Sequence, residues 1–133
     1  GYIIASETNA KRIRVLKQIN DGKLEKLGSI SLDGSPDNIS VLGNQIIVAQ
    51  VASVVSLIQH FISLQKGDYK PSPSKIESLI FDSNKAKYLK TREVLFLSLG
   101  DDISTASVGV QWEDNLLIGS ITDDKVYVCK LEE

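Results

Sequence analysis

The loop at residues 33–40 holds the residue types best suited to binding a hard metal ion. It reads Asp33-Gly34-Ser35-Pro36-Asp37-Asn38-Ile39-Ser40. Calcium takes several oxygen ligands, from carboxylates, Asn side-chain carbonyls and backbone carbonyls. Asp37 and Asn38, adjacent at the entry of a predicted strand, can supply two of them, and the others must come from elsewhere. An Asp-Asn pair is also a common turn former, so the spacing alone leaves both interpretations open.

The other residues with chemical potential form no catalytic set. His60 is the single histidine of the chain, and a lone histidine near an apolar segment is more commonly structural than catalytic. No Ser/His/Asp or Cys/His arrangement and no glycine-rich phosphate loop can be assembled. Trp112 fits a core position or a pocket wall equally well. The glycosylation sequon at Asn38-Ile39-Ser40 is a poor acceptor, because it lies at the mouth of a strand that enters the core.

Composition narrows the class of protein. The chain has 133 residues, of which 24% are charged and 42% apolar, with a formal net charge of −2. It has no basic stripe with interleaved aromatic residues, so nucleic acid is not an expected partner. The longest apolar candidate, Gln45–Leu64, is broken by polar residues and does not predict a membrane span. The chain contains no methionine and starts inside an apolar run, which suggests a fragment of a longer protein.

Short apolar segments separated by turn signals predict an all-β fold. Extended segments are expected at Tyr2–Ser6, Arg12–Lys17, Leu24–Leu32, Asn38–Val41, Gln45–Val51, Ile76–Phe81, Glu93–Leu99, Ser107–Trp112, Asn115–Ile121 and Lys125–Leu131. Ala52–Leu64 has apolar residues at helical spacing, but its β-branched residues and the strand before it favour a further strand. Residues 33–36, 67–74 and 82–92 are predicted loops. About nine or ten strands with frequent turns fit a sandwich, a barrel or propeller blades.

Several segments resemble the C-terminal part of the serum paraoxonase/arylesterase family, in the same order and at the same separation. Tyr2-Ile3-Ile4-Ala5-Ser6-Glu7 with Ile13-Arg14-Val15 is similar to a tyrosine-rich strand pair of that family. Leu24–Leu32 followed by Pro36-Asp37-Asn38-Ile39-Ser40-Val41 resembles a strand running into its DN(I/L)(S/T)V motif. Leu116-Leu117-Ile118-Gly119-Ser120 and Tyr127-Val128-Cys129-Lys130-Leu131 resemble its LLIGT strand and LYCEL ending.

The resemblance implies a six-bladed β-propeller with calcium in the central tunnel. Residues 1–133 would form the C-terminal part of this single domain, roughly its last two blades. The family hydrolyses aryl esters and lactones, with the metal polarising the substrate carbonyl. Asp37 and Asn38 match two calcium ligands, and Asn9, Ser107 and Ile121 match pocket-wall positions. No catalytic residue is expected in this chain, because the histidine dyad of the family lies upstream.

Cys129 is the only cysteine, so no disulfide can form within the chain. By itself it fits a small buried hydrophobe or a half-cystine whose partner lies upstream. The resemblance favours the half-cystine, which in the family ties the last strand to the N-terminal region. Such a bridge belongs to an oxidising compartment, so a secreted or membrane-anchored protein is expected. Implied partners are a small-molecule ester or lactone, and a lipid or membrane surface contacted through an N-terminal region absent from this chain.

Two departures from the family pattern bear on function. Ala49-Gln50-Val51-Ala52-Ser53 stands where the family carries a GCHPN run, so Val51 replaces a pocket-facing histidine. Asn9 and Lys11 also replace more apolar residues. The leading expectation is a calcium-dependent arylesterase or lactonase. The alternative is a catalytically inactive paraoxonase-like propeller that acts as a secretory-pathway chaperone or binding protein, and a third is an unrelated propeller scaffold that binds proteins.

Overall fold

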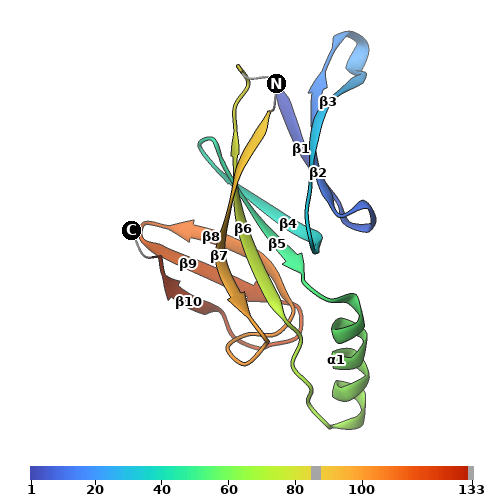
Figure 1. The fold of residues 1–133 in the computed structure, drawn as a ribbon, viewed down its shortest axis with the longest axis vertical. Helices are drawn as coiled ribbons and strands as arrows, with labels where there is room; N and C mark the ends of the chain where they lie inside the picture. The colour runs from blue at the N-terminus through green and yellow to red at the C-terminus, as the bar shows by residue number, and fades with distance from the viewer. Residues whose placement is uncertain (85–87, 132–133) are drawn as a thin grey trace.

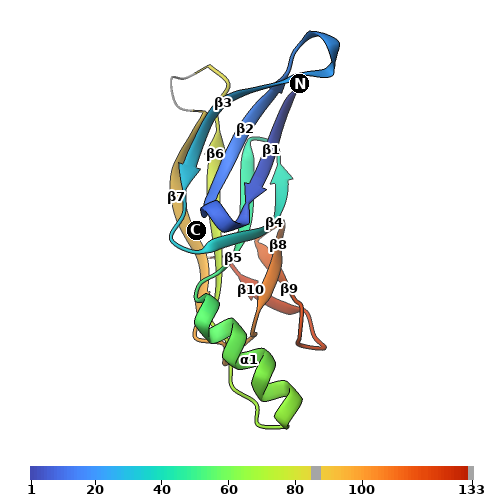
Figure 2. The same ribbon diagram turned by 90° about the vertical axis from the view of Figure 1, so that its right-hand side faces the viewer.

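The computed structural model describes residues 1–84 and 88–131 and consists mainly of antiparallel β-sheet. Three open sheets stack face to face, and one α-helix extends from one end of the stack (Figures 1 and 2). Two hydrophobic clusters fill the spaces between the sheets. The prediction of an all-β fold is confirmed at this level, with the helix as its exception.

The first sheet is a three-stranded meander, with strand order β1-β2-β3. The strands are β1 (Tyr2–Glu7), β2 (Arg12–Gln18) and β3 (Leu24–Ser31). In β2, Ile13 and Val15 are completely buried against the middle sheet. The intervening arginines point to the other face, because successive side chains of a strand alternate between its two sides. The alternation of charged and apolar residues in the sequence therefore has the expected structural cause.

The middle sheet is a four-stranded meander in chain order. Its strands are β4 (Ser35–Leu42), β5 (Gln45–Val51), β6 (Ser74–Phe81) and β7 (Leu89–Ser98). Alternate residues of β5 belong to different clusters: Ile46 and Val48 pack toward the first sheet, whereas Ile47 and Ala49 pack toward the third. A strand covered on both faces needs a continuous apolar run, and residues 46–49 provide one.

The third sheet has the order β10-β9-β8. It consists of β8 (Ala106–Trp112), β9 (Asn115–Ser120) and β10 (Tyr127–Lys130). Gly109 lets β8 approach the middle sheet, since a Cβ at this position would lie 2.9 Å from Ile76 Cγ2. On β10, Val128 is exposed while Tyr127 and Cys129 pack against the core, because successive side chains of a strand alternate between its two faces.

The predicted strand over Ala52–Leu64 is wrong, because the segment forms helix α1 (Val54–Lys66). The side chain of Ser53 caps its N-terminus by accepting a hydrogen bond from Ser56 N at 3.2 Å. Gly67, with φ of 70°, ends it in the left-handed conformation that glycine adopts without cost. These capping residues, together with the helical spacing, outweigh the unfavourable β-branched residues. No helix in residues 1–84 and 88–131 is long and apolar enough to cross a membrane.

Helix α1 turns its polar side inward and its apolar side outward. His60 and Ser63 are its buried residues. The apolar side chains on the opposite side are 40% to 66% exposed and belong to Val54, Val55, Ile58, Phe61 and Ile62. This orientation is the reverse of the usual surface helix, whose apolar stripe faces the core. Polar contacts, described below, hold the helix in place.

Two loop predictions also need correction. The loop predicted over residues 82–92 is too long, because β7 already begins at Leu89; residues 85–87 of that prediction lie outside the described residues. The loop predicted over residues 33–36 is too long as well, since Ser35 and Pro36 already pair with β5 as part of β4. As a result, Asp37 and Asn38 lie within a strand and not at its entry.

Candidate functional site

Asp37 and Asn38 occupy an irregularity in β4. Pro36 pairs with Gln50 and Ile39 pairs with Val48, so Asp37 and Asn38 face a single residue of β5 across a register shift. A bulge of this kind interrupts the ladder and re-aims the side chains it carries, and such bulges occur frequently beside functional sites. The two residues predicted to bind metal therefore lie in a β-bulge, where the regular pairing of the strand is interrupted.

Asp37 is a half-buried carboxylate without a cationic partner among the described residues. Its pKa is raised above its ordinary value, and the cause is desolvation by burial. Burial disfavours the charged form unless an opposite charge or hydrogen bonds compensate. A bound cation would provide that compensation. Asn38 is exposed and presents its amide to solvent at the same bulge.

Ser107 lies at a corresponding irregularity on the neighbouring strand. In β8 the register with β9 shifts between Ala106 and Val108, which leaves Ser107 in the shift. The hydroxyl of Ser40 donates to the carbonyl of Gly109 at 2.5 Å and joins β4 directly to β8. Two adjacent strands are thus both irregular at residues that the sequence assigned to one site.

The two strands belong to different sheets and contact each other. At one end, Ala106 N donates to Ser74 Oγ at 3.0 Å, and Ser74 is linked through Val51 to Ser35 in the ladder. At the other end lies the contact between Ser40 and Gly109. Asn38 and Ser107 both fall between these contacts. The structure therefore places the predicted metal ligands and Ser107 on two strands that contact each other, each at a register shift.

Ile121, a predicted pocket residue, follows β9 and is 57% exposed. Its backbone N–H donates to the carbonyl of Thr105 at 3.3 Å, which places it beside the start of β8. Thr105 has a φ of 51°. A β-branched residue rarely adopts this left-handed conformation, and such strain is found preferentially at functional sites. Ile121 is thus bonded to a strained residue that Ser107 follows by two positions.

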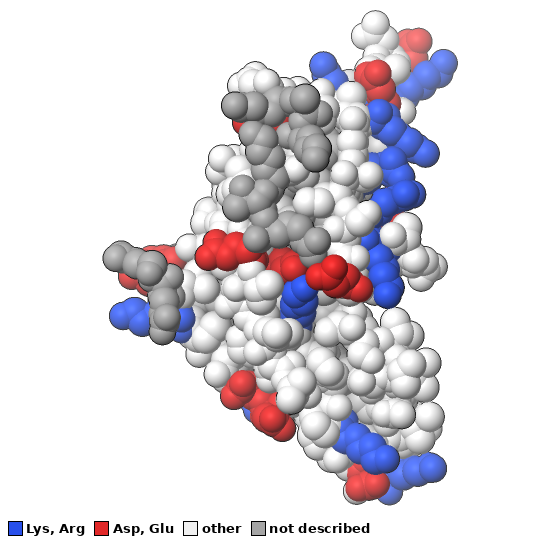
Figure 3. Space-filling model, viewed as in Figure 1, with Lys and Arg blue, Asp and Glu red and all other residues white. Residues whose placement is uncertain are grey.

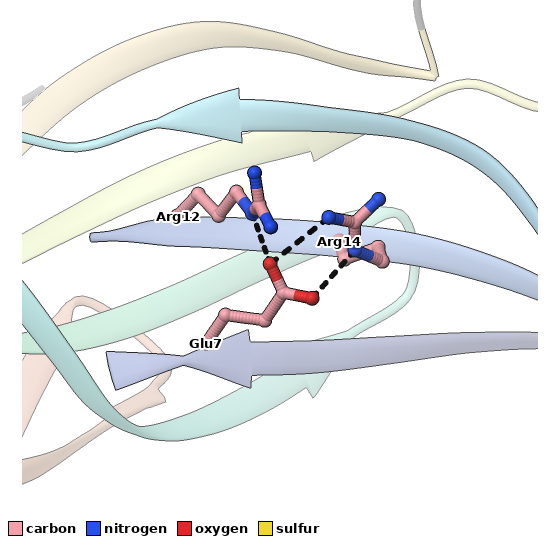
Figure 4. A network of polar contacts seen from close by, with 3 residues as sticks. All are labelled: Glu7, Arg12 and Arg14. Atoms are coloured by element: carbon pink, nitrogen blue, oxygen red, sulfur yellow. Dashed lines mark hydrogen bonds and ion pairs between the residues drawn. The ribbon is translucent and has the colours of Figure 1, made fainter. Parts of the chain in front are cut away.

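Asn9 is exposed on the 3-10 turn η1 (Thr8–Ala10) between β1 and β2, and this turn contacts β4. The hairpin on both sides of the turn is held by one carboxylate shared between two guanidinium groups (Figure 4). Glu7 Oε1 accepts from Arg14 Nε at 2.6 Å, and Glu7 Oε2 forms an ion pair with Arg12. Hydrogen bonds from Arg14 and then Arg12 lower the pKa of Glu7 from 4.5 to about 2.

Replacing Glu7 should reveal this ion pair as a pH-dependent loss of stability. A lowered pKa means that the wild-type contribution is complete above pH 4.5 and is lost as the pH falls through about 2. Glu7→Gln is therefore expected to lower the urea midpoint at neutral pH and to converge with the wild type near pH 2. Glu113→Gln, at an exposed turn, is the control and should leave the urea midpoint at neutral pH close to that of the wild type. A constant Glu7→Gln difference from pH 7 to pH 2 would contradict the assignment.

Val51, which stands where a pocket histidine was expected, is half-buried at the end of β5. The residue before it belongs to a buried polar network. Gln50 donates to Glu77 Oε2 at 2.5 Å and accepts from Gly34 N at 3.1 Å. Lys75 Nζ lies 2.7 Å from Glu77 Oε1. This network connects β5 and β6 to Gly34, the residue before β4, and no local sequence pattern predicts it.

His60, interpreted from sequence as a structural residue, is fully buried and uses both ring nitrogens. Nδ1 bonds the carbonyl of Lys70, and Nε2 lies 2.8 Å from Thr122 Oγ1. Thr122 directly follows Ile121, so His60 connects α1 to the loop that carries a predicted pocket residue. Sequence inspection could not have found this contact, because 62 residues separate its two partners.

Cys129 and Trp112 behave as ordinary side chains of the described chain. Cys129 has a free thiol, and burial together with the negative charge of Asp102 raises its pKa. A raised pKa disfavours the thiolate, and with it a nucleophilic role. Trp112 is 67% exposed, so the core position considered from the sequence is excluded.

Charged residues are unevenly distributed over the surface. Figure 3 shows Lys and Arg side chains gathered along the β1–β3 sheet, while most of the surface over α1 is uncharged except near its far end. Within residues 1–84 and 88–131, no group of three or more His, Cys, Asp and Glu side chains is arranged to hold a metal ion. A metal bound at Asp37 and Asn38 would need further ligands from other chemical groups or from another part of the protein.

Comparison with known proteins adds no relative to this picture: no family model and no curated protein matches the sequence.

Proposed function

We propose that the protein is a calcium-dependent hydrolase of aryl esters or lactones, of the paraoxonase/arylesterase type. The observation that carries the proposal is the bulge at Asp37 and Asn38. It presents a half-buried carboxylate without a cationic partner among the described residues, next to an exposed amide. Carboxylate and amide oxygens are the side-chain ligands that calcium prefers. Ser107, in the register shift of β8, would form a pocket wall near them.

Calcium at this position would act as a Lewis acid toward the carbonyl oxygen of the substrate. Asp37 would contribute negative charge and Asn38 a neutral oxygen, and the cation would remove the cost of burying the Asp37 carboxylate. Ser107, Ile121 and Asn9 would shape the space for the ester or lactone. The general base is assigned to a histidine dyad upstream of these residues, because no described residue near the site can fill that role.

The arrangement of the sheets supports a propeller as the complete fold. Propeller blades are four-stranded antiparallel meanders placed around a central channel. The β4–β7 meander has this form, and the sheets on either side of it stack against its two faces. The first strands of two successive sheets, β4 and β8, lie side by side. In a six-bladed ring these strands would face the channel, where the metal would sit.

Cys129 fits the closure of such a ring. It lies on β10, at the edge of its sheet, and its thiol is not in a disulfide. We propose that it pairs with a cysteine of the N-terminal region and that the protein matures in the secretory pathway, secreted or membrane-anchored. A membrane or lipid surface would then be contacted through that same N-terminal region.

Calcium binding to the full-length protein tests the proposal. A ligand that binds only the folded state stabilises it by RT ln(1 + [L]/Kd), about 2.7 kcal/mol at a concentration one hundred times Kd. Millimolar calcium is expected to raise the melting temperature of the wild type, and Asp37→Ala should shift the calcium titration to concentrations at least about tenfold higher. Hydrolysis of an aryl ester should be lost on chelation and in Asp37→Ala.

Asp124→Ala is the matched control, since Asp124 is an exposed turn carboxylate that should leave the titration unchanged. A wild-type melting temperature that does not respond to calcium, or an Asp37→Ala variant that responds equally, would overturn the metal assignment.

The alternative is an inactive paraoxonase-like protein that serves as a secretory-pathway chaperone or binding protein. The outward apolar side of α1 favours it, because exposed apolar patches commonly mark surfaces that bind other molecules. Val51 in place of the pocket histidine points the same way. The two candidates separate on hydrolysis: a calcium-stabilised wild type without esterase or lactonase activity would support the binding protein.

A further inference from the structure

His60 is joined to three other segments of the chain, to one through a backbone carbonyl and to two through a row of hydroxyl groups. Its Nε2 contacts Thr122 Oγ1 at 2.8 Å, Thr122 Oγ1 contacts Thr105 Oγ1 at 2.6 Å, and its Nδ1 contacts the carbonyl of Lys70. The ring also packs edge-on against Tyr69, with 5.4 Å between ring centroids. One buried imidazole thus connects α1, the loop after it, the loop after β9 and the residue before β8.

The partners of this row fix the direction of each hydrogen bond in the neutral imidazole. A carbonyl oxygen can only accept, so Nδ1 carries the proton and donates to Lys70, and Nε2 accepts from the hydroxyl of Thr122. Thr122 must then accept from Thr105. Ser120 cannot donate to either threonine hydroxyl, because its own hydroxyl already donates to the carbonyl of Ser104 at 2.6 Å. All three hydrogen bonds are satisfied with one tautomer.

The row ends on the strained residue beside the candidate site. Thr105 holds a φ of 51°, which is costly for a β-branched side chain and persists only where surrounding contacts enforce it. Its hydroxyl is bonded to Thr122, and its carbonyl accepts from Ile121 N. Two residues later, Ser107 lies in the register shift of β8. The conformation of Thr105 therefore sets the direction in which the chain enters that irregular segment.

We infer that His60 is a positioning residue of the candidate site: through Thr122 it holds Thr105 in its strained conformation, and so places Ser107 and Ile121. The inference rests on the proposed hydrolase function, because it assigns the two pocket-wall residues their places through a residue that does not touch the substrate. It also gives α1 a role, since the helix supplies the buried imidazole. The metal ligands lie on the other strand, so calcium affinity should not depend on this row.

Thr122→Val tests the inference in the full-length protein, because valine keeps the shape of threonine and removes the hydroxyl that links His60 to Thr105. The KM for an aryl ester should rise about fivefold, the equivalent of one lost neutral hydrogen bond, while calcium affinity stays at the wild-type value. Thr122→Ser retains the hydroxyl and should keep the wild-type KM. In nitrogen NMR spectra, the imidazole of His60 should carry its proton on Nδ1 in the wild type.

Failure of the inference and failure of the proposed function give different results. A wild-type protein without hydrolytic activity refutes the proposed function. The row of hydroxyl groups is then still tested by two measurements: His60 should carry its proton on Nδ1, and Thr122→Val should show faster amide exchange at residues 103–107. An active wild type in which Thr122→Val has an unchanged KM overturns the inference. So does a KM that rises equally in Thr122→Ser, or a proton found on Nε2.

Discussion

Gly100→Ala is expected to lower the free energy of unfolding by roughly 3 kcal/mol or more, because two independent costs coincide at this position. Gly100 has a φ of 107°, which residues with a side chain rarely adopt. An added Cβ would lie 2.6 Å from Ser72 O and 2.8 Å from Ser72 N. These are backbone atoms, so no side chain can rotate away to relieve the contact.

The same substitution should disturb the loops around the candidate site. Ser104 donates its hydroxyl to Gly100 O and accepts from Ser72 N, both at 3.1 Å, and so bridges the loops before β6 and β8. Pushing Ser72 away from Gly100 breaks this bridge next to Thr105. Faster amide exchange is therefore expected in residues 103–107, together with a lower urea midpoint.

Gly43→Ala is the matched control for Gly100→Ala. Gly43 also has a positive φ, 61°, but nothing lies within 4 Å of the Cβ it would gain. Only the conformational cost remains there, about 1–2 kcal/mol. Equal losses of stability in the two variants would show that the close approach to Ser72 contributes nothing.

Glu77→Ala is the second substitution with a large expected effect, about 3–5 kcal/mol of lost stability. Glu77 is 2% exposed and Gln50 is fully buried. Removing the carboxylate leaves the ammonium of Lys75, whose side chain is 12% exposed, without its closest counter-charge, and removes the acceptor of the Gln50 amide. Breaking a buried pair from one side costs the desolvation of the group that remains.

Two companion variants separate charge burial from packing. Asp33 also pairs with Lys75, at 3.3 Å, but its side chain is 78% exposed, so Asp33→Ala should cost 1 kcal/mol or less by the usual measure of exposed pairs. The double replacement Glu77→Met with Lys75→Met removes both charges and should recover most of the loss. Urea unfolding of the four proteins measures the set. A Glu77→Ala loss no larger than that of Asp33→Ala would contradict the buried network.

The strands could be predicted from the sequence where alternating side chains or a continuous apolar run fitted only an extended segment. Residues 46–49 of β5 form such a run and are buried on both faces, and side chains of β10 alternate between exposed and partly buried. Helix α1 was missed because its β-branched residues are typical of strands, although Ser53 and Gly67 are recognisable caps. The apolar residues at helical spacing were visible in the sequence, but that they face away from the core is decided only by the packing of the helix.

The candidate site shows most clearly which features the sequence predicts and which only the structure reveals. The residue types of Asp37 and Asn38 suit a metal ion but fit a turn equally well, and the family resemblance, with its order of motifs, singled out these two residues and Ser107. That they lie on two strands that contact each other, each at a register shift, follows from pairing with residues far away in the sequence. A bulge depends on how many residues face the partner strand, and one strand alone carries no record of it.

The sequence by itself determined the mainly β architecture, its turns and the residue types at the proposed calcium site, because these depend on alternation and on chemistry between near neighbours. Only the tertiary structure decided that Asp37 is desolvated without a partner among the described residues, that Thr105 is strained, and that His60 reaches Thr122. Each of these follows from contacts between segments that are distant along the chain. Burial, strain and the pairing of polar groups arise only when such segments pack together.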